Sequence, residues 1–442
     1  MKDSENLPSK VSRRNLLKGG AAFAGGAIAT RFATIGAQTP PATPATALPV
    51  TPTVAPAVAP AGVITQVRPI APIDAALVPG AASEALGGRS PYETPALAPV
   101  GVTTGSTLTP LQSLQGVITP SDLHFQRHHN GIPLIDPALW SLTVHGLVDK
   151  PLTLSLADIK RFPSVTRQYF IECSGNGRSA FRTPKREMTA QEVDGMTSNS
   201  EWTGVPVSAI LREAGVRGDA PWVLAEGGDA ARMARSIPIE KMMDDALLVY
   251  AQNGEPLRQG VGYPVRLLLP GYEGNMSVKW LRRLEATPRA TFTRNETAKY
   301  TDPLADGTVR YFSFVLDAKS IITSPSYPAH VTPGWWPVSG LAWTGRGRIT
   351  RVEVSTDSGK TWHDAQLQAD STDRTHVRFV HMWKWDGGAT RLLSRATDET
   401  GYVQPTLAEY KRVRGSGTDY HFNYIRAWDV VADGGVYFGV NA

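Results

Sequence analysis

Residues 168–178 read Gln-Tyr-Phe-Ile-Glu-Cys-Ser-Gly-Asn-Gly-Arg and contain Cys173, the one cysteine among the 442 residues of the chain. A lone cysteine excludes an intramolecular disulfide, a Cys-x-x-Cys redox pair, a Cys-x-x-Cys-His haem attachment motif and a cysteine-rich zinc cluster. Three alternatives remain for Cys173. It is a small buried hydrophobe, a nucleophile, or a single thiolate ligand to a metal that other groups also hold.

The neighbours of Cys173 favour a chemical role. Residues 169–171 are typical of a short buried strand, and the glycines of 174–177 predict a sharp turn that tolerates positive φ and close approach of a ligand. The basic side chain of Arg178 favours the thiolate over the thiol. A purely structural cysteine does not require these features.

Residues 1–37 form a basic start, Ser12-Arg13-Arg14-Asn15-Leu16-Leu17-Lys18, and then an Ala/Gly-rich run. They resemble a twin-arginine export signal, which predicts a periplasmic protein. The alternative of a membrane helix is less favoured, because the run is shorter than the roughly 20 residues that span a bilayer. This segment carries most of the net charge of +5. The mature protein would therefore be nearly neutral, and nothing in its charge points to nucleic acid or a membrane surface.

Residues 38–116 consist mainly of Ala, Pro, Val and Thr with few charges. Such a composition buries too little surface to offset the entropy of ordering, so we expect a linker. Globular character begins near Val117.

Residues 117–309 predict a mixed α+β domain of largely antiparallel character. Apolar and polar residues alternate in the strand 141–146, a helix is expected at 207–214, and Gly/Pro turns separate further short strands. Neither a G-x-G-x-x-G loop opening a helix nor a G-x-x-x-x-G-K motif occurs. A phosphorylated cofactor would therefore be held by convergent side chains from separate turns.

Residues 310–442 predict a second domain. Short alternating strands with turns between them, such as the turn 356–360, indicate a β-sandwich of immunoglobulin type. The cluster Arg127-His128-His129 lies near the start of the first domain, before the strand 141–146, and it places several hydrogen-bond donors in front of a turn. This cluster is interpreted either as an anion-binding group or as ordinary structural histidines.

Taken together, these motifs resemble the sulfite oxidase family of molybdenum enzymes over residues 117–442. Within the family, the likeness is greatest to the molybdenum subunit of the sulfane dehydrogenase of periplasmic sulfur-oxidising (Sox) systems. The sequences that carry it are Leu123-His124-Phe125, Arg127-His128-His129, Phe170-Ile171-Glu172-Cys173-Ser174-Gly175-Asn176, Tyr263-Pro264-Val265-Arg266, Val278-Lys279-Trp280-Leu281 and His421-Phe422-Asn423.

The resemblance implies one molybdenum-molybdopterin per chain, with Cys173 as the protein ligand to the metal. A thiolate suits a metal that is already bound to sulfur. By motif position, the implied pterin contacts are His129, Asp229, Arg266, Ser277 and Lys279. Val261 occupies the position where the family places a further pterin-binding histidine, so that imidazole is absent here.

The implied substrate pocket contains Arg127, Arg178, Tyr300 and Arg414. Guanidinium groups form paired hydrogen bonds with the oxygens of a sulfur oxyanion, and a tyrosine hydroxyl can donate to substrate.

The implied reaction is a two-electron oxygen-atom transfer to sulfane sulfur on a carrier protein. No haem is expected in this chain, so a cytochrome c-type subunit would accept the electrons, and the last domain implies a dimer or heterotetramer. The first alternative is a dehydrogenase of free sulfite. The second is an exported binding or scaffold protein that keeps the fold without the metal.

Overall fold

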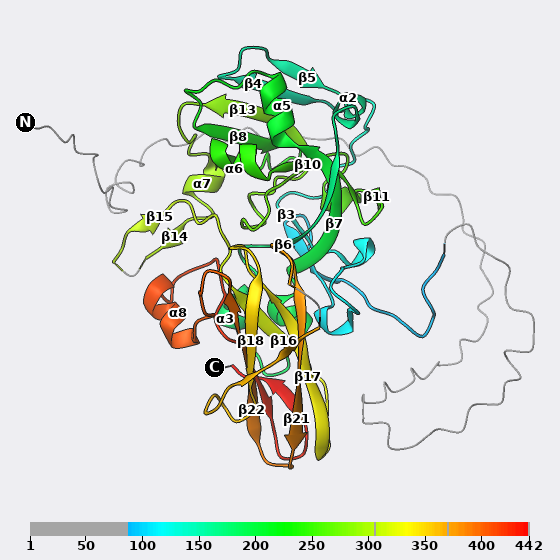
Figure 1. Ribbon diagram of the computed structural model, residues 1–442, viewed down its shortest axis with the longest axis vertical. Helices are drawn as coiled ribbons and strands as arrows, with labels where there is room; N and C mark the ends of the chain where they lie inside the picture. Colours follow the sequence, from blue (N-terminus) through cyan, green and yellow to red (C-terminus); the bar gives the residue numbers. More distant parts are fainter. Residues whose placement is uncertain (1–86, 305, 369–370, 441–442) are drawn as a thin grey trace, which may run out of the picture. The chain divides into compact units, whose positions relative to one another are not determined.

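Cys173 follows the last residue of a strand in a five-stranded antiparallel sheet. The computed structural model describes residues 87–304, 306–368 and 371–440. The sheet has the order β11-β10-β7-β6, with β12 paired to β10 (Figure 1). Its strands are β6 (Val165–Glu172), β7 (Thr197–Pro206), β10 (Leu247–Gln252), β11 (Glu255–Pro256) and β12 (Arg266–Leu268).

A second five-stranded sheet packs with the first around one apolar core. Its order is β5-β4-β13-β8-β9, and the β13–β4 pair alone is parallel among its pairs. The core unites Val144 and Leu284 of this sheet with Leu248 and Leu267 of the first. The strands and the short helices beside them are β4 (Leu142–Gly146), β5 (Leu152–Leu154), β8 (Trp222–Gly227), β9 (Ala234–Pro238), β13 (Leu281–Thr287), α2 (Leu156–Lys160), α5 (Val207–Glu213) and α6 (Ile239–Asp244).

These elements confirm the mixed α+β prediction for this part of the chain. The strand expected at 141–146 is β4, and the helix expected at 207–214 is α5. Helix α5 ends where predicted because Gly215 adopts a φ of +66°, which a residue with a Cβ rarely adopts. Apolar periodicity therefore located the principal elements of this part of the fold.

The predicted linker boundary at residue 116 is too late. Strands β1 (Ala98–Gly101), β2 (Gly105–Leu108) and β3 (Gln126–His128) form a three-stranded sheet. The 3-10 turns η2 (Leu111–Ser113) and η3 (Ser121–Leu123) lie between β2 and β3 in the sequence. Leu108, Leu111 and Leu114 are buried. These leucines, spaced three residues apart, supply the apolar surface that the surrounding composition lacks. The predicted signal 1–37 and residues 38–86 of the linker lie outside the described residues.

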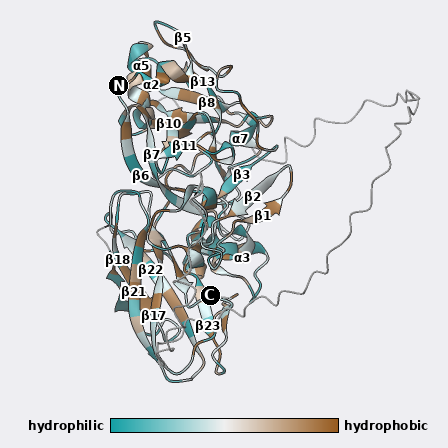
Figure 2. Ribbon diagram, turned by 90° about the vertical axis from the view of Figure 1, so that its right-hand side faces the viewer, coloured by the Kyte–Doolittle hydropathy of each residue, from teal (hydrophilic) through white to brown (hydrophobic). Residues whose placement is uncertain are grey.

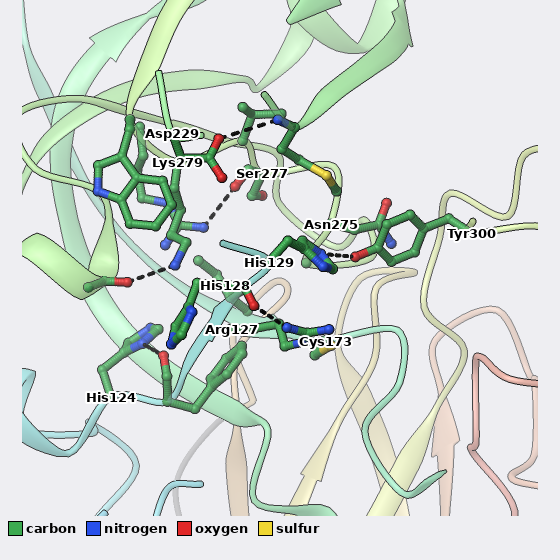
Figure 3. A pocket seen from close by; sticks show the side chains of 18 residues that line it. His124, Arg127, His128, His129, Cys173, Asp229, Asn275, Ser277, Lys279 and Tyr300 are labelled. Carbon is green, nitrogen blue, oxygen red and sulfur yellow. Dashed lines mark hydrogen bonds between the residues drawn. The ribbon is translucent and has the colours of Figure 1, made fainter. Parts of the chain in front are cut away.

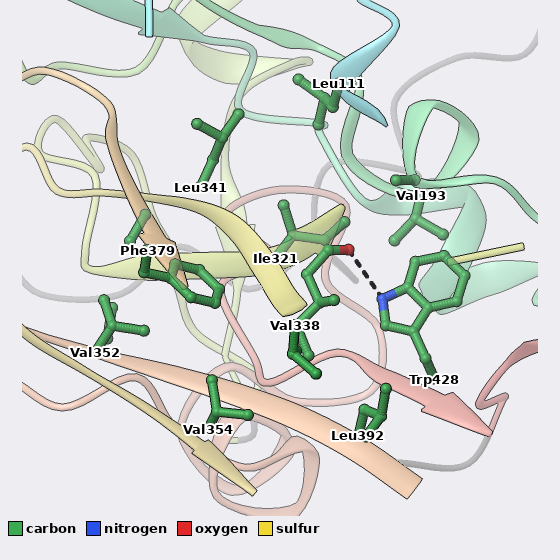
Figure 4. Packing of buried hydrophobic residues seen from close by; sticks show 14 of the residues in the cluster. Leu111, Val193, Ile321, Val338, Leu341, Val352, Val354, Phe379, Leu392 and Trp428 are labelled. Atoms are coloured by element: carbon green, nitrogen blue, oxygen red, sulfur yellow. Dashed lines mark hydrogen bonds between the residues drawn. The ribbon is translucent and has the colours of Figure 1, made fainter. Parts of the chain in front are cut away.

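The C-terminal part consists of two antiparallel sheets that share a core. One has the order β16-β17-β21-β20 and the other β19-β18-β22-β23-β24. Ile321, Phe379, Val352, Leu392 and Trp428 from both sheets pack together (Figure 4). The strands are β16 (Lys319–Ser324), β17 (Gly334–Trp343), β18 (Ile349–Ser355), β19 (His363–Asp364), β20 (Gln366–Leu367), β21 (Val377–Trp385), β22 (Thr390–Asp398), β23 (Ala427–Val430) and β24 (Val436–Phe438).

Hydrophobic and hydrophilic residues alternate along these C-terminal strands (Figure 2). The turn expected at 356–360 lies in the connection between the paired strands β18 and β19, as predicted. The remaining elements are η4 (Gln259–Val261), α3 (Arg178–Arg182), α4 (Ala190–Asp194), α7 (Arg294–Thr297), α8 (Leu407–Arg414), β14 (Asp302–Pro303) and β15 (Val309–Arg310). Within the described part of the chain, no helix has the length and apolar character that crossing a membrane requires.

The segment around Cys173 shares the core of the C-terminal sheets. Phe170 of β6, Ala180 of α3 and Val193 of α4 belong to the same buried cluster as Ile321 and Trp428. The C-terminal sheets therefore support the elements on either side of Cys173.

Candidate active site

Backbone hydrogen bonds fix the turn that carries Cys173. The Cys173 N–H donates to the carbonyl of Met196 at 2.9 Å, and the Asn176 N–H donates to the carbonyl of Cys173 at 2.9 Å. Gly177 adopts a φ of +93°, and a Cβ there would lie 2.3 Å from the Arg426 guanidinium. The predicted positive φ in this turn is confirmed at Gly177. The group that approaches Gly177 closely is the buried Arg426 side chain, whereas a ligand was expected there.

A buried cluster of four charges supports the same turn. Lys319 Nζ lies 2.9 Å from Glu172 Oε1 and 2.6 Å from Asp194 Oδ1, and Arg426 Nε lies 2.9 Å from Asp194 Oδ2. The Asn176 amide also donates to Glu172 at 2.9 Å. Two cations thus balance two carboxylates directly behind Cys173.

Two cavities meet at Cys173. The inner cavity has a volume of about 70 Å³ and the outer one about 480 Å³. Four residues line both of them, namely Arg127, His129, Cys173 and Tyr300 (Figure 3). The structure therefore brings residues 127–129 and Tyr300, which are distant from Cys173 in sequence, to its thiol.

The inner cavity collects the predicted pterin contacts. Asp229, Arg266, Ser277 and Lys279 line it together with His129. Arg266 donates to the carbonyl of Ser277 at 2.9 Å, and Lys279 Nζ donates to the carbonyl of Gly260 at 2.8 Å. Burial lowers the pKa of Arg266 to about 9 and moves the pKa of Lys279 well below its usual value. Two crowded cations therefore face this chamber, and an anionic group would relieve them.

Val261 supports this chamber through Arg266 and does not line it. Its side chain is buried in an apolar cluster, while its carbonyl accepts a hydrogen bond from Arg266 at 2.9 Å. The absence of an imidazole at this position leaves the placement of Arg266 intact.

Arg127, Arg178 and Tyr300, three of the four residues assigned to the substrate pocket, line the outer cavity together. The Tyr300 hydroxyl lies 2.7 Å from His129 Nε2. Burial, with Arg127 and Lys279 nearby, lowers the pKa of His129 to about 4. Burial raises the pKa of Tyr300 well above its usual value. At neutral pH, His129 is therefore uncharged and Tyr300 keeps its proton.

Both arginines are held in place and keep N–H groups to spare. Arg178 donates from Nε and from its terminal nitrogen to the carbonyl of Asp419, at 3.0 and 2.6 Å, and stacks on Tyr420. Arg127 donates to the carbonyl of Gly105 at 3.1 Å. Since each guanidinium has five N–H donors, both can also bind an anion.

The surroundings of Cys173 act on its thiol in opposite directions. Burial raises the pKa of Cys173, whereas the Gly175 N–H, Arg127 and Arg178 lower it, and burial dominates. Arg178 does lower the pKa of Cys173, as expected, but the effect of burial is larger.

Arg414 does not belong to this site. It ends helix α8, where its guanidinium lies 3.5 Å from Asp302 and 3.2 Å from Asp317, and it lines neither cavity at Cys173. His421 Nε2 lies 2.8 Å from the same Asp317 carboxylate, and the His421 N–H donates to the carbonyl of Ser174. The prediction of Arg414 as a substrate contact is wrong, because two carboxylates already bind its guanidinium.

Several lining residues were not predicted as site residues. Arg294, Lys299 and Tyr420 line the outer cavity, and His124 and Asn275 line the inner one. His124 belongs to a motif that the sequence had shown, and Lys299 adjoins Tyr300. Charged residues such as Arg294, at the start of the short helix α7, carry no pattern that distinguishes them from solvated ones.

Comparison with known proteins identifies the family. Residues 129–294 match the model of the oxidoreductase molybdopterin binding domain, and residues 310–427 match the Mo-co oxidoreductase dimerisation domain. The solved sulfane dehydrogenase SoxCD from Paracoccus pantotrophus is 42% identical, with a TM-score of 0.79 over 82% of this chain and 96% of that chain.

Curated relatives agree. Mouse mitochondrial sulfite oxidase is 31% identical over 68% of this chain, and chicken sulfite oxidase is 32% identical over 67% of this chain and 70% of its own length. Arabidopsis NADH nitrate reductase 1 is 32% identical over 66% of this chain. The chain spans 60% of the mouse protein and 36% of the Arabidopsis protein. The chain belongs to the sulfite oxidase family of molybdopterin-binding oxidoreductases.

Proposed function

We propose that this protein is a periplasmic molybdenum oxidoreductase that oxidises sulfane sulfur held on a carrier protein. The observation that carries the proposal is the basic outer cavity, where Arg127, Arg178, Arg294 and Lys299 surround the approach to Cys173. Four cations around one thiol favour an anionic substrate. A cavity of about 480 Å³ is far larger than a single sulfur oxyanion and leaves room for a tethered arm.

The polar groups that line the inner cavity match those of a phosphorylated pterin with a bound metal. Arg266 Nε is buried without a hydrogen-bond partner, as is His124 Nε2. Such unpaired buried groups call for a polar ligand, since leaving them unpaired is unfavourable. Arg266 and Lys279 would neutralise a phosphate, and Cys173 supplies the soft ligand that a sulfur-bound metal prefers. We infer that His129, Asp229, Arg266, Ser277 and Lys279 hold the pterin.

When bound, molybdenum-molybdopterin supplies a two-electron oxygen-atom transfer to sulfur. The residues of the outer cavity bind and orient the substrate for it. Arg127 and Arg178 pair with the anionic sulfur group, and the Tyr300 hydroxyl donates a hydrogen bond to it. His129 holds that hydroxyl in place by donating from Nε2 to its oxygen at 2.7 Å, which leaves the hydroxyl proton for the substrate. In each turnover, water supplies the oxygen, two protons leave, and the electron pair passes to an acceptor.

We infer that the acceptor is a separate cytochrome c-type subunit. A single cysteine cannot form the two thioether bonds of a Cys-x-x-Cys-His haem attachment. The 42% identity to the sulfane dehydrogenase SoxCD supports the proposed reaction for which this acceptor is needed. The match of residues 310–427 to a dimerisation domain supports a dimer or heterotetramer. We further propose that the two C-terminal sheets have immunoglobulin topology and that the twin-arginine segment directs export.

The second candidate is a dehydrogenase of free sulfite, which the identity to mouse and chicken sulfite oxidases favours. Turnover with a thiosulfate-loaded carrier protein, compared with turnover on sulfite, separates the two. Fast oxidation of sulfite with none of the loaded carrier would refute the sulfane proposal.

Replacing the proposed metal ligand tests the reaction itself. Cys173→Ser should abolish turnover and leave the fold intact, because a hydroxyl is a poor substitute for a thiolate toward a soft metal. Circular dichroism of the purified variant checks the fold. Retained turnover would refute the role of Cys173.

A further inference from the structure

His124 is a buried polar residue of the inner cavity to which the proposed mechanism gives no role. It is 1% exposed and follows the 3-10 turn η3. Its ring stacks on Phe125 and meets Trp202 edge-on, with ring centroids 5.5 Å apart. Arg266 packs over the same Trp202 ring, 5.6 Å from its centroid. His124 and Arg266 therefore share one aromatic neighbour at this end of the chamber.

The hydrogen bond of His124 fixes its tautomer. Nδ1 lies 2.8 Å from the backbone carbonyl oxygen of Phe125. Because a carbonyl oxygen can only accept, the proton must be on Nδ1. Burial lowers the pKa of His124 to about 3, and the nearby Arg266 and Lys279 act in the same direction. The ring is therefore neutral at physiological pH, and Nε2 presents a lone pair.

That lone pair has no partner among the residues that the structure describes. Nε2 of His124 is buried and makes no hydrogen bond, and the same is true of Nε of Arg266. One of these atoms accepts and the other donates. A phosphate group offers acceptors only, so it could satisfy Arg266 but not His124. A pterin ring offers N–H groups next to a carbonyl oxygen and can satisfy both.

We propose that His124 is a further cofactor-holding residue, whose Nε2 accepts a hydrogen bond from an N–H group of the pterin ring while Arg266 Nε donates to an acceptor on the same ligand. This inference rests on the proposed molybdopterin cofactor. Val261 leaves the chamber without an imidazole from η4, and His124 supplies one from the N-terminal side (Figure 3). The chamber thereby gains a neutral acceptor in addition to the carboxylate of Asp229, which lies at its other end (Figure 3).

The test compares three variants for their hold on the cofactor. His124→Phe keeps the ring packing and removes the acceptor, and His124→Gln restores an acceptor through its amide oxygen. His376→Phe is the matched control. His376 is also buried and neutral, with a pKa of about 3 and an unpaired Nδ1, but it lines neither cavity at Cys173. Pterin per chain is measured from the fluorescence of the extracted, oxidised cofactor, and its release is followed during dialysis of the holoenzyme.

We expect His124→Phe to release the pterin about tenfold faster than the parent, as the loss of one hydrogen bond to a buried group implies. His376→Phe should match the parent, and His124→Gln should recover part of the difference. The melting temperature of each variant made in a host that cannot synthesise molybdopterin reports folding separately. There, the two Phe variants should behave alike.

Equal pterin release from the parent and His124→Phe would overturn the inference. Equal acceleration of pterin release in His124→Phe and His376→Phe would also overturn it. So would a cofactor-free His124→Phe that melts well below cofactor-free His376→Phe. Either result would show that His124 stabilises the fold and does not hold the cofactor. Absence of pterin from the parent protein would instead refute the proposed cofactor, so the two failures are distinguishable.

Discussion

Lys319→Met should destabilise the protein strongly, because it removes one cation from the buried charge cluster behind Cys173. The Lys319 side chain is 1% exposed, and its ammonium contacts both Glu172 and Asp194. Without it, Arg426 is the one cation left against two buried carboxylates. Breaking a buried ion pair by removing one partner costs about 3–5 kcal/mol of the free energy of unfolding. A typical domain has about 5–15 kcal/mol in total.

The matched control is Lys150→Met. Lys150 also pairs with a carboxylate, Glu213, at 3.0 Å, but the two side chains are 66% and 50% exposed. Exposed pairs contribute about 0–1 kcal/mol, so this variant should unfold nearly as the parent does. Denaturant titration of the cofactor-free proteins, followed by circular dichroism, measures both.

A double variant distinguishes the charge effect from lost packing. In Lys319→Met with Glu172→Gln, the remaining Asp194–Arg426 pair is neutral, so the double variant should be at least about 1 kcal/mol more stable than the sum of the single effects predicts. If Lys319→Met loses no more stability than Lys150→Met, or if the double variant is strictly additive, the account of this cluster is wrong.

Three further predictions concern the site and the charges next to it. Tyr300→Phe should lower kcat about 10- to 100-fold in steady-state assays while the cofactor stays bound, because the hydroxyl that faces His129 is lost; unchanged kcat would exclude a role for it. Arg414→Ala should leave KM for substrate within about twofold, since Arg414 lines neither cavity at Cys173. It should lower the free energy of unfolding by about 3 kcal/mol, because the buried ion pair with Asp317 is lost. A large rise in KM would contradict the exclusion of Arg414 from the site. His421→Gln should be less stable than the parent by an amount that shrinks as pH rises above about 6.5, the ordinary pKa of histidine. Burial lowers the pKa of His421, but its hydrogen bonds to carboxylates raise the pKa by more. The stabilisation that protonated His421 provides is therefore complete below the pKa of the unfolded state and is lost as pH rises through the pKa of the folded state. A stability difference that does not change with pH would refute the pairing of His421 with these carboxylates.

Much of the site could be predicted because its residues lie in short, recognisable motifs. Cys173 ends an apolar strand before a glycine turn, and Arg266 follows an aromatic-Pro-Val stretch. Each motif fixes its own local structure through alternation and turn chemistry. Nine of the ten predicted site residues, which the resemblance to the family assigned by motif position, line the two cavities at Cys173.

The remainder depended on contacts between distant segments. Lys319 opens an apolar strand and could equally have faced solvent, yet it pairs with Glu172, 147 residues away in sequence. Arg414 follows basic neighbours on a short helix, and its carboxylate partners lie about a hundred residues earlier. Which charge meets which is decided by tertiary packing, and no local pattern encodes it.

The most direct test of the central claim is the reduction of molybdenum in the native protein, followed optically together with elemental analysis. We predict about one molybdenum per chain, as the single thiolate of Cys173 implies. The absorption should change rapidly with thiosulfate-loaded carrier protein and more slowly with free sulfite. Less than about one-tenth of a molybdenum per chain, or a spectrum that neither substrate changes, would contradict the account and favour an exported scaffold that keeps the fold without the chemistry.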